Sequence, residues 1–208
     1  INFFLIFIGV DGAGKSTTIK NVSQKFNGHL TQKLHYHGLR SSVVWKWTQK
    51  LKLFSRKFKR NVTKKDRQRV NADIVRGSYT STLITLLYLL EYRWRCFWAV
   101  GFPKSVITLH VCDRSYLDTF LYRSEALLKY FQPKKYLLVY LTGRPELIHE
   151  RKPELEIEEI SQKNIRYISL ISKLNNLILD TTQDSEAEVC DKIVSFAIEN
   201  IRESEQRC

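Results

Sequence analysis

Apolar residues along the chain fall into short runs that alternate with longer stretches of mixed character. Each short run has the length of a strand and ends at a glycine, an aspartate or a turn, which is typical of buried strands in a parallel sheet. These runs predict strands at about 3–8, 33–37, 106–112, 136–141 and 177–179.

The longer stretches repeat their apolar positions at the spacing of amphipathic helices. The stretch 77–101 is rich in Leu, Tyr and Trp but carries Glu91, Arg93 and Arg95, so we expect a buried core helix and not a membrane span. The predicted helices are about 15–26, 77–101, 117–130, a short helix through 151, a helix from the acidic residues 154–159 to about 174, and 186–202.

Strands that alternate with helices predict an α/β protein with a parallel sheet. We therefore expect a three-layer αβα sandwich in which a five-stranded parallel sheet carries helices on both faces. A length of 208 residues fits a single domain over 1–208. The apolar start of the chain is too short to span a bilayer and has no basic region before it, so we interpret it as the first strand and not as a signal peptide.

Charge and cysteine content narrow the classes of partner and compartment. The 34 Lys and Arg residues against 21 Asp and Glu residues give a net charge of +13, which favours anionic partners such as nucleotides, nucleic acid or an acidic membrane surface. No two cysteines form a C-x-x-C pair, so reduced thiols in a cytoplasmic protein are expected. The four cysteines are Cys96, Cys112, Cys190 and Cys208.

The segment 9–17, with the sequence G-V-D-G-A-G-K-S-T, lies between the first strand and the first helix. It matches the Walker A or P-loop pattern G-x-x-x-x-G-K-[ST] in the structural context that the pattern needs. Its backbone N–H groups can surround phosphate oxygens, Lys15 can neutralise the β- and γ-phosphates, and the Ser16 hydroxyl can ligate Mg²⁺. The residues predicted to bind ATP here are Gly9, Asp11, Gly12, Ala13, Gly14, Lys15, Ser16 and Thr17.

Further polar residues follow the other predicted strands. Asp113 comes directly after the third strand, as the Walker B aspartate that reaches Mg²⁺ does in P-loop proteins. Ligands of open α/β sheets bind beyond the carboxyl ends of the strands. The residues expected at this edge, besides the P-loop, are Arg40, Asp113, Arg114, Arg144 and Asp180.

Phosphoryl transfer depends on positioning and on cations more than on covalent chemistry of the protein. Arg144, Arg151 and Lys152 belong to the proline-punctuated segment 144–160, which we predict to be a lid. The candidate cations for an acceptor phosphate are Arg40, Arg93 and Arg114.

The segment 43–70 alternates aromatic residues with Lys and Arg before it becomes almost purely charged. Charge runs are usually solvated faces, which favours a solvated helix or an insertion whose aromatic residues pack on the domain. A basic amphipathic helix can also contact nucleic acid or an anionic membrane, and this alternative stays open.

These motifs together resemble the thymidylate kinase-like branch of the P-loop nucleoside monophosphate kinases over nearly the whole chain. The residues that carry the resemblance are 7–17 with Asp11 inside the loop, H-G-L-R at 37–40, L-L-E-Y-R at 89–93, C-D-R-S-Y-L-D at 112–118, P-E at 145–146, E-R-K-P-E-L at 150–155, Tyr167, and I-L-D at 178–180.

The resemblance implies an enzyme that moves the γ-phosphoryl group of MgATP to dTMP or a related nucleoside monophosphate, and it suggests a homodimer. It implies catalytic roles for Lys15, Asp11, Arg114 and Arg151, and Mg²⁺ binding by Ser16 and Asp113. By the same resemblance Arg144 and Asp180 belong to the ATP site. The implied acceptor-binding residues are Arg40, Arg93, Arg114 and Tyr116.

Three departures from the family pattern leave the acceptor open. Arg40 is followed by two serines where the family has R-E-P, Ser115 stands where the family has a tyrosine, and the basic segment 43–70 is longer than a simple thymidylate kinase needs. The alternatives are a kinase of the same scaffold that acts on a phosphosugar or a polynucleotide 5′ end, and a non-enzymatic ATP-dependent binding protein that docks through 43–70.

Overall fold

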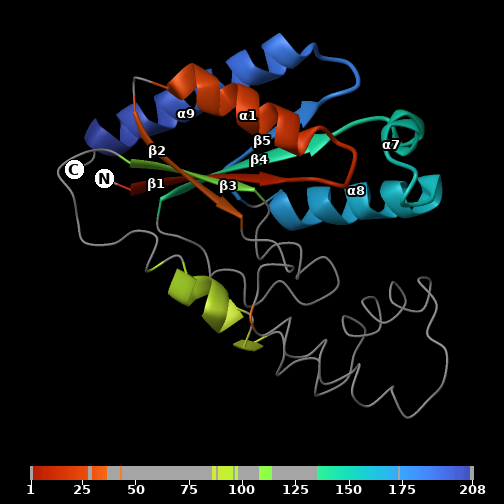
Figure 1. The fold of residues 1–208 in the computed structure, drawn as a ribbon, viewed down its shortest axis with the longest axis horizontal. Helices are drawn as coiled ribbons and strands as arrows, with labels where there is room; N and C mark the ends of the chain where they lie inside the picture. The colour runs from red at the N-terminus through yellow and green to blue at the C-terminus, as the bar shows by residue number, and fades with distance from the viewer. Residues whose placement is uncertain are drawn as a thin grey trace.

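The computed structural model describes residues 2–27, 30–36, 43, 86–87, 89–95, 97, 108–113, 135–172 and 174–206. Within them the predicted alternation of strands and helices is confirmed (Figure 1). The elements are β1 (Asn2–Ile8), α1 (Lys15–Phe26), β2 (Thr31–Tyr36), β3 (Thr108–Asp113), β4 (Tyr136–Thr142), α7 (Pro145–Arg151), α8 (Ile157–Ile171), β5 (Asn176–Asp180) and α9 (Glu186–Gln206).

Several boundaries differ from the predicted ones. Strand β2 begins at Thr31, before the predicted start, because its pairing with β3 already starts with Thr31 beside Thr108. Helix α9 continues to Gln206, since its last residues are polar helix formers with no glycine or proline among them. The predicted helix 117–130 lies outside the described residues, whereas the described positions of 86–97 are helical, as predicted for 77–101.

The described strands form one five-stranded sheet in the order β2-β3-β1-β4-β5, with every neighbouring pair parallel. Strand β1 lies at the centre, and its residues from Phe3 to Ile8 are all buried. A strand buried on both faces reads as a continuous apolar run, which is the pattern that the sequence has here. The predicted parallel sheet is therefore confirmed.

Helices cover both faces of the sheet. Figure 1 shows α1 and α9 together on one face, and α8 and the helical residues of 86–97 on the other. The Lys25 ammonium of α1 pairs with Asp191 of α9 at 2.5 Å. The apolar residues that these two helices bury between themselves and the sheet include Ile19, Val22, Phe26, Val189, Ile193 and Ala197. The three-layer αβα arrangement is thus confirmed.

Two remaining predictions concern membranes and cysteines. No helix in the described part of the chain is both long and apolar enough to cross a membrane. Cys112 and Cys190 are buried free thiols, as expected. Cys96 and Cys208 lie outside the described residues.

Candidate active site

The carboxyl ends of the parallel strands meet at one edge of the sheet. The register places Asp113 of β3 beside Phe7 of β1, and Thr142 of β4 beside Asp180 of β5. The glycine-rich loop 9–14 leaves the central strand between them. Residues from distant parts of the chain therefore share the edge where ligands of open α/β sheets bind.

The glycine-rich loop follows a path that only glycine adopts without strain. Gly9, Gly12 and Gly14 have φ angles of 148°, 94° and 78°. At Gly9 a Cβ atom would lie 2.3 Å from the carbonyl oxygen of Leu141 in β4, so the loop passes directly over the neighbouring strand. At Gly14 nothing lies within 4 Å, and only the left-handed conformation favours glycine there.

The middle of this loop also touches α7. A Cβ atom at Gly12 would lie 2.9 Å from the carbonyl oxygen of Ile148 and 3.2 Å from Cβ of Lys152. Both residues belong to α7 or to its C-terminal cap. The helix that opens the predicted lid segment 144–160 therefore packs on the loop itself.

Lys15 turns its side chain back into the loop, and its exposed fraction is only 7%. The ammonium donates to the carbonyl oxygens of Gly9 and Val10, both at 2.8 Å, and lies 3.8 Å from Oδ1 of Asp11. These partners hold a positive charge at the centre of the loop. An anion that enters the loop meets this charge at once.

The N-terminus of α1 adds donors and partial positive charge at the same place. The amide of Thr18 donates to the Gly14 carbonyl at 3.0 Å, and the first turn of the helix contains no acidic residue. The first amides of a helix have no acceptor within the helix, and the helix dipole favours anions there. Ser16 and Thr17 in this turn are exposed, so the geometry of the loop and helix together suits an anion.

Asp113 supplies the acidic group at this edge. Its Oδ1 atom is buried and has no hydrogen-bond partner among the described residues. A buried acceptor without a partner costs about 1–3 kcal/mol, which a bound cation would offset. Oxygen ligands such as Asp113 and Ser16 suit Mg²⁺, which usually binds one or two carboxylates together with substrate phosphates. The described residues include no cluster of three His, Cys, Asp or Glu that could hold a metal ion.

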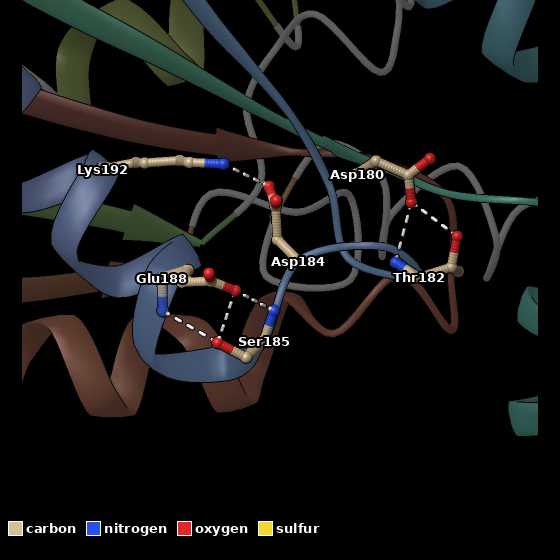
Figure 2. A network of polar contacts seen from close by, with 6 residues as sticks. All are labelled: Asp180, Thr182, Asp184, Ser185, Glu188 and Lys192. Atoms are coloured by element: carbon tan, nitrogen blue, oxygen red, sulfur yellow. Dashed lines mark hydrogen bonds and ion pairs between the residues drawn. The ribbon is translucent and has the colours of Figure 1, made fainter.

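The turn after β5 is held by side chains. Asp180 Oδ1 accepts hydrogen bonds from the amide of Thr182 at 2.8 Å and from its hydroxyl at 2.5 Å (Figure 2). The Thr182 hydroxyl oxygen in turn accepts from the backbone amide of Arg144 at 3.1 Å. Asp180 therefore fixes the turn, and the turn holds the start of α7.

A capping box begins α9 immediately after this turn (Figure 2). The amide and hydroxyl of Ser185 donate to Glu188 Oε2 at 2.9 and 2.7 Å, and the Glu188 amide donates back to the Ser185 hydroxyl at 3.3 Å. These hydrogen bonds from Ser185 hold the pKa of Glu188 below its ordinary value. Lys192 adds an ion pair to Asp184 at 2.8 Å. The sequence pattern S-x-x-E predicts such a cap, but the sequence analysis did not include it.

The two arginines of the predicted lid stand at the ends of α7. Arg144 is its N-cap, with an exposed side chain. Arg151, its last residue, donates from Nη1 to the Thr181 hydroxyl at 3.2 Å and from Nη2 to the Thr181 carbonyl at 3.0 Å. Sequence reasoning missed Thr181 and Thr182, although they follow directly on the strand end that it singled out.

The acceptor side of the predicted site is described only in part. Arg93 is exposed on the helical residues of 86–97. The other predicted acceptor residues, Arg40, Arg114 and Tyr116, lie outside the described residues, as does the segment 43–70 apart from Val43. Tyr167, which the resemblance associates with the closing helix and the adenine-side loop, is buried in α8 with its ring 5.3 Å from that of Tyr140.

A histidine pair joins β2 and β3, with His35 next to last in β2 and His110 third in β3. His35 Nε2 is 3.0 Å from His110 Nδ1, and His110 Nε2 is 3.0 Å from Oδ1 of Asn2. Burial lowers the pKa of His110 to about 4, and His35 and Lys33 contribute to the shift. The sequence analysis gave no role to these strand residues.

Comparison with known proteins shows similarity at the level of structure. No protein-family model matches the sequence, and no curated protein matches it. The thymidylate kinase of Candida albicans aligns with 96% of this chain and 92% of its own at a TM-score of 0.63 and 15% identity. The YorR protein of Bacillus subtilis, solved in complex with phosphorylated GDP, aligns over 96% and 98% at a TM-score of 0.55 and 17% identity. The chain therefore has a thymidylate kinase-like α/β fold, as predicted.

Proposed function

We propose that this protein is a Mg²⁺-dependent kinase that transfers the γ-phosphoryl group of ATP to a phosphate oxygen of a nucleoside monophosphate, dTMP or a relative. The observation that carries the proposal is the glycine-rich loop, which holds the buried Lys15 ammonium at the N-terminus of α1. The buried, unpartnered Oδ1 of Asp113 on the adjacent strand adds a cation ligand. The kinase fold supports the same class of reaction.

The loop residues from Gly9 to Thr17 would bind the donor phosphates through backbone amides. Lys15 would exchange the carbonyls of Gly9 and Val10 for phosphate oxygens, because a charged acceptor forms the stronger hydrogen bond. Asp113 and Ser16 would hold Mg²⁺, which when bound neutralises phosphate charge and orients the transferred group.

In the transfer, the bond between the γ-phosphorus and the bridging oxygen of ADP breaks as a bond to the acceptor phosphate oxygen forms. The acceptor oxygen is already ionised, so no base has to remove a proton. Arg114 and Arg151 would balance the charge that develops, as Arg40, Arg93 and Tyr116 bind the acceptor. Asp11 would assist at the loop, and Arg144 and Asp180 would contact the donor.

The remaining parts of the proposal rest on the sequence. We expect a single domain in which the segment 144–160 closes as a lid and excludes water from the site. A homodimer, a cytoplasmic location and contact of 43–70 with nucleic acid or an anionic membrane stay predictions.

An acceptor screen tests the proposal. Labelled ATP and Mg²⁺ are incubated with each nucleoside monophosphate in turn, and diphosphate products are measured, with the Lys15→Ala variant as the control. A preference for one pyrimidine monophosphate would support the proposal and identify the substrate. Consumption of ATP without a diphosphate would favour a phosphosugar or polynucleotide acceptor. Bound ATP without any turnover would favour an ATP-dependent binding protein.

A further inference from the structure

Two successive threonines hold the two ends of α7 on the turn between β5 and α9. The Thr182 hydroxyl accepts from the backbone amide of Arg144, before the first turn of α7. Thr181 accepts from the guanidinium of Arg151, at the last residue of α7, through both its hydroxyl and its carbonyl oxygen. The contact of Thr182 fixes a backbone amide, whereas the contact of Thr181 fixes the position of a charged side chain, that of Arg151.

The Thr181 hydroxyl is oriented by the end of β4. Its Oγ1 donates to the carbonyl oxygen of Thr142 at 3.2 Å, and the Thr181 amide donates to the same carbonyl at 2.9 Å. The single hydroxyl proton is therefore directed at Thr142, which leaves the oxygen lone pairs for Arg151. The acceptor that Arg151 meets is fixed to the sheet.

In the described part of the chain, Arg151 is bound by neutral oxygens and not by an acidic side chain. Within the described residues its guanidinium contacts the two neutral oxygens of Thr181 and no carboxylate. The next residue offers a contrast, because Lys152 pairs with Glu154 at 3.4 Å. A guanidinium that meets only neutral oxygens can still form a charge-assisted pair with an anion.

Arg151 is also close in the chain to the residues that touch the glycine-rich loop. Ile148 and Lys152, three residues before it and one after it, make the contacts with Gly12. The turn of helix that carries Arg151 is thus packed against this loop. The Arg151 guanidinium is therefore carried by the part of α7 that packs on the loop.

We propose that Thr181 is a positioning residue that holds the Arg151 guanidinium ready to meet the donor nucleotide. This inference rests on the proposed function and assigns a residue that the sequence analysis did not consider. The long arginine side chain loses less freedom on binding when Thr181 already restricts it. Arg151 keeps its two hydrogen bonds to Thr181 and donates its remaining N–H groups to phosphate oxygens, which form stronger, charge-assisted hydrogen bonds.

A double-mutant cycle with Thr181→Val and Arg151→Gln tests this. The valine variant removes the hydroxyl and keeps the volume of the side chain. We expect Thr181→Val to weaken MgADP binding in calorimetry, and to raise the KM for ATP, by about 3- to 10-fold. kcat should change by less than about twofold, because the interaction acts on binding and not only in the transition state. In the Arg151→Gln background the same substitution should have no further effect.

Controls separate positioning from a general loss of structure. Thr181→Ser keeps the hydroxyl and should bind MgADP like the unmodified protein. Thr31→Val makes the same chemical change on an exposed residue at the opposite end of the sheet and should leave binding unchanged. If Thr181→Val does not fold, Arg151→Gln and Thr181→Ser still carry the test, since the first must weaken binding and the second must not.

Three results would overturn the inference. MgADP binding by Thr181→Val equal to that of the unmodified protein would exclude the role of Thr181, while the proposed kinase function would stand. The role of Thr181 would also be excluded if the two substitutions lowered MgADP affinity by factors that multiply in the double variant, because Thr181 would then act independently of Arg151. An unmodified protein that binds no MgADP or MgATP would instead overturn the proposed function together with this inference.

Discussion

The glycine-rich loop between β1 and α1 and the turn between β5 and α9 lie at the same edge of the sheet, but different forces hold them. The loop depends on backbone conformation at three glycines and on Lys15, which bonds to main-chain carbonyls. The turn depends on side chains, from Asp180 through Thr182 to the Ser185 and Glu188 cap. The carbonyl acceptors of Lys15 lie near it in sequence, whereas the turn forms hydrogen bonds with Thr142, Arg144 and Arg151 from other elements.

This difference has a consequence for the reaction. A loop built from backbone offers donors that any nucleoside triphosphate can use, since every such nucleotide carries the same phosphates. A turn built from side chains can differ between relatives without damage to the sheet. We therefore expect changes in the loop to abolish function and changes in the turn to adjust it.

The largest effect is expected for Lys15→Ala. The substitution removes the charge at the centre of the loop, and phosphoryl transfer should fall at least about 100-fold, as for other lost electrostatic contacts to a transition state. Lys20→Ala, on the exposed side of the same helix, is the control and should keep its activity. Unchanged ATP turnover in Lys15→Ala would contradict every kinase reading of this chain.

Glycine substitutions compare two positions within the loop. Gly9→Ala meets both a positive φ and a Leu141 oxygen 2.3 Å away, so its free energy of unfolding should fall by about 3 kcal/mol. Gly14→Ala meets no atom within 4 Å and should lose only about 1–2 kcal/mol from the left-handed conformation. Urea unfolding measures both. Equal losses would mean that the close passage over β4 does not constrain the loop.

The pH dependence of global stability should come from the histidine pair and act on both regions alike. His110 has a pKa of about 4 in the folded protein against 6.5 as its ordinary value. Below pH 6.5 the unfolded chain therefore binds a proton that the folded protein does not, and stability falls as the pH decreases toward 4. Between about pH 7 and about pH 5 the loss should be about 2 kcal/mol in urea unfolding. His110→Gln should remove most of this dependence of the free energy of unfolding on pH. If the dependence is unchanged in that variant, other titratable groups cause it.

The smallest effect is expected at the cap of α9, and it should be confined to the turn. Ser185→Ala should lower the free energy of unfolding by about 1 kcal/mol, without a change in the loop. Because the pKa of Glu188 is lowered, its contribution is present above the ordinary value of 4.5 and is lost as the pH falls through the folded value. Hydrogen exchange of the amides of 182–189 against those of 13–18 would measure this. If Ser185→Ala accelerated hydrogen exchange equally in both segments, the loop and the turn would not be independent.

The predictable parts of this protein are those whose partners are neighbours in the chain. The alternation of apolar runs and amphipathic stretches suffices for the α/β fold, and the spacing of 9–17 suffices for the loop and for Lys15 at its end. The capping box of Ser185 and Glu188 was equally local and could have been predicted. The boundaries of β2 and α9 were less accurate, because pairing with β3 and the absence of a helix breaker decide where they lie.

Contacts between elements required the tertiary structure. The strand order places Asp113 and Asp180 on opposite sides of the loop, and no local pattern encodes that order. Three contacts form only when separate elements pack together. They are the contact of Gly12 with α7, the hydrogen bond between His35 and His110, and the hydrogen bond from Arg151 to Thr181. Hydrophobic periodicity predicts which face of a helix or strand is buried, but not which other element that face packs against. The sequence thus suffices for the elements and the glycine-rich loop, and only packing and strand register decide which distant side chains lie beside that loop.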